Sequence, residues 1–276
     1  MLEPFNRVTD NIPKVMGILN VTPDSFSDGG VFFSVTTALA RARQMYQEGA
    51  ALIDIGGEST RPGAQPVSVQ EELDRVMPVL EQVRAQLPVH ISVDTSKPEV
   101  MRAAIAAGVD MINDVMALRR EGSLAAVAAA NSVQICLMHL QGEPRTMQYN
   151  PYYEDVVREV RDFLLMRVQA CVQAGINPSR LLIDPGFGFG KTLAHNLLMM
   201  SQLHIFTQLG YQVLVGVSRK SLLGTLLNKP VTERLFGSLA LATIAISKGA
   251  SIIRTHDVAA TVDALKVTCA VLQQPV

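Results

Sequence analysis

The sequence predicts an α/β fold in which eight parallel strands close into one (β/α)8 barrel, the TIM barrel. Three observations lead to this prediction. Short runs rich in Val and Ile alternate with helical patterns from one end of the 276-residue chain to the other. That length is close to the about 250 residues typical of such a barrel. No linker rich in Ser, Gly or Pro interrupts the alternation, so we expect a single domain over residues 1–276.

Eight strands are expected, each a short apolar run that ends in polar residues. We place them near residues 15–19, 51–55, 89–93, 110–114, 133–138, 181–184, 213–217 and 251–255. Their starts recur at the length of one strand, one helix and one return loop. A doubly wound open sheet is the alternative, but it normally has about six strands, and its phosphate-binding GxGxxG pattern is absent here.

Helices between the strands are predicted from apolar spacing and capping signals. One helical face combines Val35, Leu39, Ala42 and Tyr46, and another combines Val69, Leu73, Val76, Leu80 and Val83. Ser68 with Glu71 fits a capping box at the start of the second of these helices. Ser96 with Glu99 fits another at the start of the following helix.

Composition excludes several classes of protein. Lys and Arg number 24 against 25 Asp and Glu, a net charge of −1, so no overall field attracts nucleic acid or an anionic membrane. The N-terminal residues form no secretory apolar block, and the longest apolar run, 235–246, is shorter than a membrane-spanning helix. Cys136, Cys171 and Cys269 form no CxxC pair, which indicates reduced thiols. We expect a soluble cytoplasmic protein without nucleic-acid or membrane partners.

Polar residues follow nearly every predicted strand, where a barrel of this kind builds its active site. In chain order they are Asn20, the segment GGESTRPG, Asp94 to Ser96, Asn113 with Asp114, His139, Asp184 with PGFGFGK, the segment SRKS, and Arg254 to Asp257. Any one of them alone is more simply a loop residue or a helix cap. Together they are expected to converge at one mouth of the barrel.

Two chemistries are represented in this group. Asp94, Asn113 and Asp184 provide acceptors and an amide suited to a flat heterocycle with amino and ring N–H donors. Lys220, Arg254 and His256 suit an anion, and the loops after the last two strands are the usual phosphate site of this barrel.

Competing motifs fail on inspection. PGFGFGKT has Pro185 where a phosphate-binding P-loop needs its first glycine. Its glycines are better suited to letting backbone and Phe189 approach a flat ligand. No HExxH or paired Cys/His spacing predicts zinc, and Ser218 lacks the second glycine of a nucleophile elbow.

Eight segments in one order closely resemble the dihydropteroate synthase family of folate biosynthesis. They are MGILNVTPDSFSDGG (16–30), GGESTRPGA (56–64), ISVDTSKPEV (91–100), IND (112–114), LMHLQGEPRTMQ (137–148), DPGFGFGK (184–191), VGVSRKS (215–221) and IIRTHDV (252–258). The resemblance implies a (β/α)8 barrel, in agreement with the strand count. It also implies a homodimer.

The same resemblance implies a reaction. p-Aminobenzoate would be joined to 6-hydroxymethyl-7,8-dihydropterin diphosphate, giving 7,8-dihydropteroate and pyrophosphate. Sulfonamides would occupy the p-aminobenzoate site as inhibitors. Breaking the bond between methylene and diphosphate leaves positive charge on the pterin side and a departing polyanion on the other, and both need stabilisation.

Roles for individual residues follow from the resemblance. The pterin would be held by Asp94, Asn113, Asp184 and Lys220 between apolar walls made by Val115, Met138 and Phe189. The diphosphate would meet Asn20, Arg254 and His256, with Mg²⁺ bridging Asn20 to its oxygens. The p-aminobenzoate site would combine Phe26, Asp28, Thr60, Arg61, Pro62 and Ser221. The candidate catalytic residues are Asp94, Lys220, Arg254, His256 and Asp28.

Two other functions use part of this residue set. A pterin-binding methyltransferase barrel shares the pterin carboxylates and amide but needs neither GGESTRPG nor an anion pair. A non-catalytic pterin-binding paralogue would not need both loops complete. Release of pyrophosphate that depends on p-aminobenzoate separates all three.

Overall fold

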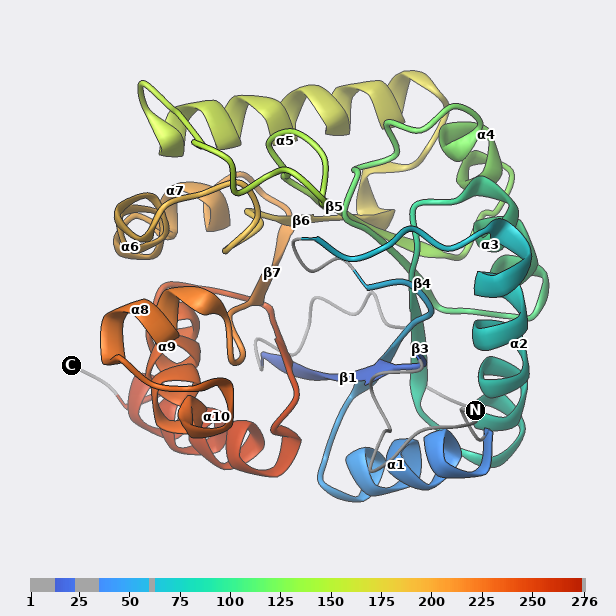
Figure 1. The fold of residues 1–276 in the computed structure, drawn as a ribbon, viewed down its shortest axis with the longest axis horizontal. Coiled ribbons are helices and arrows are strands. Elements are labelled where there is room, and N and C mark those ends of the chain that lie inside the picture. The colour runs from blue at the N-terminus through green and yellow to red at the C-terminus, as the bar shows by residue number, and fades with distance from the viewer. Residues whose placement is uncertain (1–12, 23–34, 60–62, 275–276) are drawn as a thin grey trace.

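Eight parallel strands form a closed barrel in the part of the chain that the computed structural model describes, residues 13–22, 35–59 and 63–274 (Figure 1). They are β1 (Lys14–Asn20), β2 (Leu52–Gly56), β3 (His90–Asp94), β4 (Met111–Asp114), β5 (Gln134–Met138), β6 (Leu181–Asp184), β7 (Gln212–Gly216) and β8 (Ile252–Thr255). Each strand pairs with its neighbour in sequence, and β8 closes on β1. The (β/α)8 barrel and its eight strand positions are confirmed.

Helices surround the barrel and cover its outer surface (Figure 1). They are α1 (Val35–Gln47), α2 (Val69–Gln86), α3 (Pro98–Ala106), α4 (Ser123–Ala128), α5 (Val156–Gln173), α6 (Leu193–Ser201), α7 (His204–Thr207), α8 (Ser221–Leu227), α9 (Leu235–Ser247) and α10 (Val258–Leu272). Short 3₁₀ turns, η2 (Pro178–Arg180) and η3 (Val231–Glu233), precede β6 and α9. No helix among the described residues combines the length and the apolar character needed to cross a bilayer.

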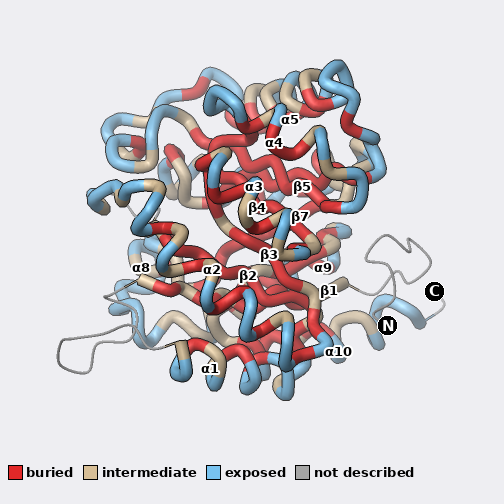
Figure 2. Tube along the Cα trace, turned by 90° about the vertical axis from the view of Figure 1, so that its right-hand side faces the viewer, coloured by how far each residue is buried: buried red, intermediate tan, exposed pale blue. Residues whose placement is uncertain are grey.

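The core has two layers because successive side chains of a strand point to opposite faces. The larger layer lies between strands and helices and includes Ile53, Ile91 and Val215 (Figure 2). The smaller one fills the inside of the barrel and consists of Met16, Leu52, Met111, Cys136, Leu182, Leu214 and Ile252. The barrel interior is therefore packed and closed toward the strands' N-terminal ends, so any ligand must enter from the other end.

Two expectations about the helices need correction. The capping box of Ser68 and Glu71 is present, but α3 begins after Lys97 without a side-chain cap. Ser96 instead donates a hydrogen bond of 2.5 Å to the buried carboxylate of Asp114. Tertiary structure thus uses the hydroxyl that local spacing assigned to the helix.

The buried face of α1 is also different from the one expected. Ala38, Ala42 and Met45 are buried, whereas Tyr46 is exposed. Small residues permit close packing on the barrel, and Met45 lies against Gly17 of β1, where a Cβ would come within 2.6 Å of its sulfur. Side-chain size therefore determines which face of α1 packs against the barrel.

Candidate active site

Strand register places the predicted polar residues in one row at the carboxyl ends of the strands. Asn20 pairs with Gly56, Gly56 with Asp94, and Asp94 with Asn113. On the other side of the barrel Met138 pairs with Asp184, and Arg254 pairs with Gly216. The carboxyl ends of all eight strands therefore meet at one mouth, as the sequence predicted.

Arg254 is the centre of an ion-pair network inside this mouth. Its Nε lies 2.6 Å from Asp54 Oδ2, and its Nη2 lies 2.9 Å from Asp94 Oδ2. Asn113 donates to the same Asp54 oxygen at 3.1 Å. Burial opposes the charge of Arg254, but the two carboxylates outweigh it and raise the pKa of the guanidinium. Arg254 is consequently a fixed positive charge at every working pH.

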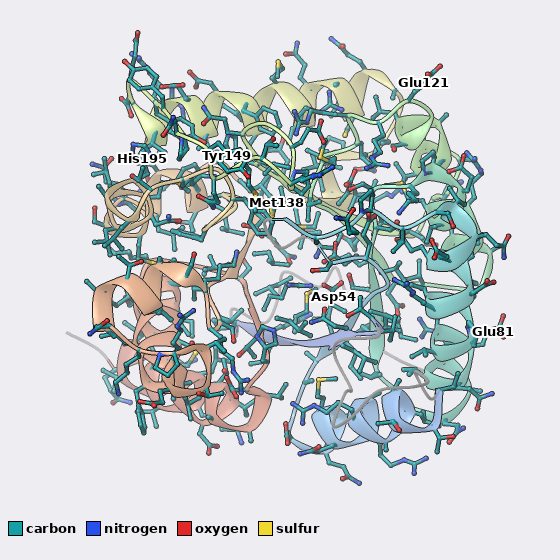
Figure 3. The ribbon with its side chains drawn as sticks, in the orientation of Figure 1. Asp54, Glu81, Glu121, Met138, Tyr149 and His195 are labelled. Atoms are coloured by element: carbon teal, nitrogen blue, oxygen red, sulfur yellow. The ribbon has the colours of Figure 1, made fainter. Side chains whose placement is uncertain are left out.

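Asp54 is a site residue that sequence reasoning missed. It lies in the middle of β2, is fully buried, and lies within the ring of strands (Figure 3). Its Oδ1 has no hydrogen-bond partner among the described residues. The sequence did contain a signal: an acid within the apolar run LIDIG, since a buried carboxylate needs a partner. The site prediction considered only residues at the ends of strands, and Asp54 lies within one.

Burial shifts the acids of the mouth toward their protonated forms. The pKa of Asp94 is raised by burial, with Arg254 opposing and Asp54 adding to the effect. The pKa of Asp184 is raised by burial against the attraction of Lys220. Clustered carboxylates with raised pKa values are typical of ligand and catalytic sites.

Lys220 and Asp184 form a second charged group across the mouth from Asp54. Asp184 Oδ1 accepts a 2.7 Å hydrogen bond from the Gly186 amide. The Lys220 ammonium lies 4.2 Å above the Phe189 ring and donates to the Phe187 carbonyl. Burial lowers the pKa of Lys220 to about 7. The structure thus places Lys220 with Asp184 and Phe189, whereas residue chemistry alone had grouped it with the anion-binding cations.

An apolar wall lines the same side of the mouth. Val115, Met116, Met138, Leu140 and Met147 form a separate buried cluster, against which Phe189 packs. All three walls named from the sequence, Val115, Met138 and Phe189, are therefore brought together. An apolar surface beside buried acceptors is the usual form of a pocket for a flat polar ring.

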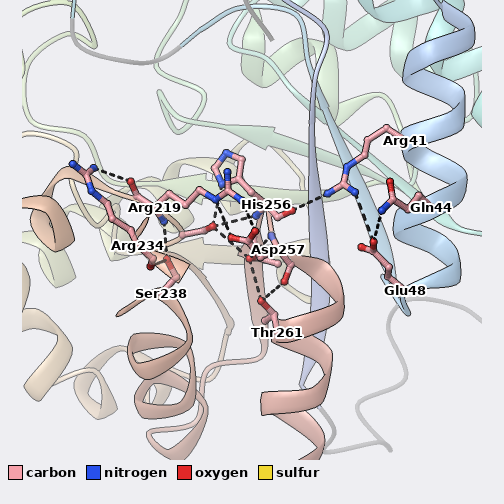
Figure 4. Close-up of polar contacts among 11 residues, drawn as sticks. Arg41, Gln44, Glu48, Arg219, Arg234, Ser238, His256, Asp257 and Thr261 are labelled. Carbon is pink, nitrogen blue, oxygen red and sulfur yellow. Dashed lines mark hydrogen bonds and ion pairs between the residues drawn. The ribbon is translucent and has the colours of Figure 1, made fainter. Parts of the chain in front are cut away.

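His256 lies at the end of β8 in a network of its own (Figure 4). Its Nδ1 is 3.0 Å from Ser218 Oγ, and its backbone N–H donates to the same hydroxyl at 3.1 Å. Arg41 of α1 donates to the His256 carbonyl at 2.9 Å. Ser218 thus fixes the imidazole and does not act as the nucleophile of an elbow motif, which its sequence context had already excluded.

Arg219 and Asp257 hold the two loops that carry Lys220 and His256. Arg219 has a left-handed φ of 56° and forms a two-point ion pair with Asp257, with 2.9 Å between Nε and Oδ2 (Figure 4). Its amide donates to Ser238 of α9. The loops after β7 and β8 are therefore fixed to each other.

The p-aminobenzoate residues are only partly described. Phe26, Asp28, Thr60, Arg61 and Pro62 lie outside the described residues. Ser221 is exposed at the first position of α8, directly after Lys220. Ser221 is therefore the one residue predicted for p-aminobenzoate whose position the structure describes, and the site itself stays a prediction.

A buried ion-pair cluster outside the mouth was also missed. Lys97 Nζ lies 2.6 Å from Glu58 Oε2 and also pairs with Glu72 of α2. Glu58 accepts a hydrogen bond from the Val67 amide at 3.2 Å, so one carboxylate contacts both stems of the connection between β2 and α2. Long-range pairs of this kind carry no sequence signal.

The donor set fits Mg²⁺ and does not suit a metal held entirely by protein. No group of three His, Cys, Asp or Glu able to hold a metal occurs among the described residues. The Asn20 amide oxygen lies on the row of strand ends, close to Gly56 and Asp94. One hard oxygen ligand beside an anion site is what Mg²⁺ uses when substrate phosphates and water complete its octahedron.

Known proteins share both this sequence and this fold. Residues 16–256 match the family model for pterin binding enzymes. A dihydropteroate synthase of Haemophilus influenzae is 54% identical over 263 residues, covering 95% of each chain. The crystal structure of the Yersinia pestis dihydropteroate synthase with a sulfonamide drug has a TM-score of 0.92 and 50% identity, covering 96% of each chain.

A further solved structure contains the reaction product. The dihydropteroate synthase of Xanthomonas albilineans in complex with 7,8-dihydropteroate is 49% identical, with a TM-score of 0.87, and the match covers 96% of this chain and 95% of that one. Together with the matched family model and the conjunction of acceptors, cations and apolar wall at one mouth, this places the chain in the pterin-binding enzyme family, among the dihydropteroate synthases.

Proposed function

We propose that this chain condenses 6-hydroxymethyl-7,8-dihydropterin diphosphate with p-aminobenzoate, giving 7,8-dihydropteroate and pyrophosphate. One observation carries the proposal. The acceptors Asp94, Asn113 and Asp184 share a mouth with Arg254 and His256, so one substrate can present a heterocycle to the first group and a diphosphate to the second. The Xanthomonas albilineans relative has been solved with 7,8-dihydropteroate and also with 4-aminobenzoic acid.

The pterin ring is assigned to the side of the mouth that combines acceptors with an apolar wall. Asp184, Asn113 and Asp94 accept from the amino and ring N–H groups, while the Lys220 ammonium donates to the ring oxygen. Val115, Met138 and Phe189 contact the ring faces. Asn113 and Asp184 are buried and Asp94 is nearly so, which favours a ligand that satisfies them, because unpaired polar groups are costly there.

The diphosphate is assigned to Asn20, Arg254 and His256. Asp54 and Asp94 contact Arg254 through Nε and Nη2, and its Nη1 has no hydrogen-bond partner among the described residues. The fork can therefore bind phosphate oxygens without losing its carboxylates. With Mg²⁺ bound at Asn20, the ion would act as a Lewis acid and template for the leaving group.

Catalysis follows from charge placed on two sides of the bond that breaks. The bond between the exocyclic methylene and the diphosphate oxygen breaks as the arylamine nitrogen bonds to that carbon, and the amine loses one proton. Asp94 stabilises positive charge that spreads into the pterin, and Arg254 with His256 stabilises the departing anion. The neutral amine needs no strong base, so its placement and the exclusion of water decide the rate.

The second substrate is assigned to Phe26, Asp28, Thr60, Arg61, Pro62 and Ser221. A flat aromatic acid needs apolar surface for its ring and a polar end for its carboxylate. Ser221 stands at the start of α8, next to Lys220, and provides the polar end. Sulfonamides would bind at the same residues, and the Yersinia pestis relative has been solved in complex with a sulfonamide drug.

A homodimer is proposed from an exposed apolar surface on α8, α9 and α10, which lie side by side (Figure 1). Its residues are Leu226, Leu227, Phe236, Val267 and Val271, and Phe236 is 77% exposed. Exposed apolar side chains on neighbouring helices are typical of an association site. Phe236→Glu should convert a dimer to a monomer in sedimentation velocity, and an unchanged sedimentation coefficient would remove this surface from the interface.

A cytoplasmic location is proposed from the cysteines. Cys136, Cys171 and Cys269 are free, and burial raises the pKa of the Cys136 thiol well above its ordinary value. Free, unreactive thiols suit a reducing compartment.

One assay tests the proposed function against both alternatives. Purified protein is incubated with the pterin diphosphate and Mg²⁺, and pyrophosphate release is followed with and without p-aminobenzoate. Release that depends on p-aminobenzoate, with dihydropteroate as the second product, is expected. A methyltransferase or a non-catalytic paralogue would bind the pterin and release no pyrophosphate under either condition.

A further inference from the structure

Lys191 is a buried cation next to the site that has no part in the reaction described above. It follows the glycine-rich segment 185–190 and is 3% exposed. Its Nζ lies 2.9 Å from His139 Nδ1, 2.9 Å from the Gly186 carbonyl and 3.0 Å from the Phe189 carbonyl. A lysine amine has three positions for hydrogen bonds beyond its own carbon, and all three are filled.

This set of contacts does not require a charge on Lys191. Burial lowers its pKa well below the ordinary value, with Asp184 opposing and Lys220 adding to the effect. Burial and Lys191 also lower the pKa of His139 to about 2, so the imidazole is neutral. An ammonium donates three hydrogen bonds, whereas a neutral amine donates to the two carbonyls and accepts from Nδ1–H. All three contacts of Nζ can therefore be hydrogen bonds whether Lys191 is charged or neutral.

The segment that Lys191 holds is tightly packed in an unusual conformation. Gly186, Gly188 and Gly190 all have positive φ, and a Cβ on Gly186 would come within 1.9 Å of the His139 carbonyl oxygen. Tyr153 donates its hydroxyl to the Gly190 carbonyl at 2.9 Å. A turn with three left-handed residues needs fixed partners for its carbonyls, and the amine of Lys191 provides two of these contacts.

The same turn carries groups assigned to the pterin. The Gly186 amide donates to Asp184 Oδ1, and the Phe189 ring packs on the apolar wall beneath the Lys220 ammonium. Because Nζ contacts the carbonyls of Gly186 and Phe189 themselves, displacement of the amine would move both groups. Lys191 touches the turn from its buried side and Lys220 from the mouth.

We infer that Lys191 is a positioning residue, which holds the 186–190 turn so that Phe189 faces the pterin ring. The inference rests on the proposed function, because it takes the ligand of this pocket to be a pterin. Lys191 acts through the turn and does not itself contact substrate. A general contribution to folding would affect both substrates equally, whereas positioning of the turn affects the pterin alone.

Lys191→Met tests this, because methionine fills the same volume without donors. Lys248→Met is the matched control: Lys248 Nζ also donates to a backbone carbonyl, that of Ser201 at 3.0 Å, but it precedes β8 at the opposite end of the barrel. Calorimetry with 6-hydroxymethylpterin and steady-state kinetics with both substrates are measured. Lys191→Met should weaken pterin binding about tenfold and change the KM for p-aminobenzoate less than about twofold. The control should change neither.

A double-mutant cycle with Phe189→Ala identifies the route. If Lys191 acts through the position of Phe189, Lys191→Met should cost far less in the Phe189→Ala background than in the wild type. Additive losses, unchanged pterin affinity, or equal changes for both substrates would overturn the inference. Should Lys191→Met fail to fold, Lys191→Gln, which keeps an amide donor, takes its place in the same cycle.

The wild-type protein separates the two proposals. A wild type that releases no pyrophosphate contradicts the proposed function. An active wild type whose Lys191→Met variant binds the pterin normally contradicts only the positioning role.

Discussion

Asp184 has its two carboxylate oxygens in different environments. Oδ1 accepts from the Gly186 amide, which leaves Oδ2 for a ligand donor. Asp184→Asn preserves shape and the first contact but presents an N–H₂ group where a ring donor should bind. We expect affinity for 6-hydroxymethylpterin to fall by about 2 kcal/mol, roughly thirtyfold, even without p-aminobenzoate. Calorimetry measures it, and unchanged affinity would remove Asp184 from the pterin site.

Substitutions of Arg254 and Lys220 should have different effects on binding and catalysis because the two residues contact opposite ends of the substrate. Arg254→Ala should lower kcat/KM by an amount equivalent to the loss of about 2 kcal/mol or more of transition-state stabilisation. The same variant should bind a pterin without diphosphate nearly as well as the wild type. Lys220→Ala should weaken binding of that bare pterin. Equal loss of bare-pterin binding in both variants would contradict the division of roles. Arg254→Ala also leaves Asp54 and Asp94 without their common partner, so thermal unfolding must be followed beside it.

Pterin affinity should depend on pH through Lys220. Burial lowers the pKa of this lysine to about 7, against the attraction of Asp184, so the free protein carries the ammonium only below that pH. A ligand oxygen that accepts from the ammonium raises this pKa, and binding at higher pH therefore takes up a proton. Affinity should fall as the pH rises above about 7. Calorimetry in buffers of different ionisation enthalpy detects the proton, and Lys220→Met should abolish its uptake.

At the scale of elements, the connection between β2 and α2 is fixed at its stems by Lys97, Glu58 and Glu72. Lys97 stands before α3 and reaches Glu58 at the end of β2 and the fully buried Glu72 of α2. Glu58 contacts the Val67 amide on the far side of the connection. The segment between these stems includes Pro62, which is assigned to p-aminobenzoate. Three elements therefore determine where that loop begins and ends.

Lys97→Met should raise the KM for p-aminobenzoate several-fold, as Pro62→Ala should, and leave pterin affinity nearly unchanged. Loss of the cation leaves the fully buried carboxylate of Glu72 without its partner, so the free energy of unfolding should also fall, by about 3 kcal/mol. Arg102→Met on the same α3 is the control, because its pair with Glu99 is exposed and worth under about 1 kcal/mol. A Lys97 variant that is less stable but has an unchanged KM would show that the cluster serves folding only.

The whole molecule shows how far a sequence of this kind can be interpreted. Strand positions were predictable because each apolar run ends in polar residues, and parallel strands bring those ends to one mouth. Asn20, Asp94, Asn113, Asp184 and Arg254 were found in this way, and the register confirms that they share that mouth. Ligand contacts themselves stay predictions.

Other features depend on contacts between residues distant in the chain. Asp54 lies mid-strand and is explained by Arg254, 200 positions away, and by Asn113. Lys97 and Lys191 are surface-type residues that the fold buries among partners from other units. The spacing of Ser96 was compatible with a helix cap, but its hydroxyl donates a hydrogen bond to Asp114 instead. Local rules cannot anticipate such pairs because they exist only once the barrel closes.

The central claim is that one mouth holds the pterin on one side and the diphosphate on the other. A crystal structure of the protein with 6-hydroxymethylpterin, pyrophosphate and Mg²⁺ tests it most directly. The pterin should contact Asp94, Asn113 and Asp184 with its ring against Phe189, and pyrophosphate should contact Arg254 and His256. A pterin bound away from Asp184, or pyrophosphate bound away from Arg254, would contradict the claim.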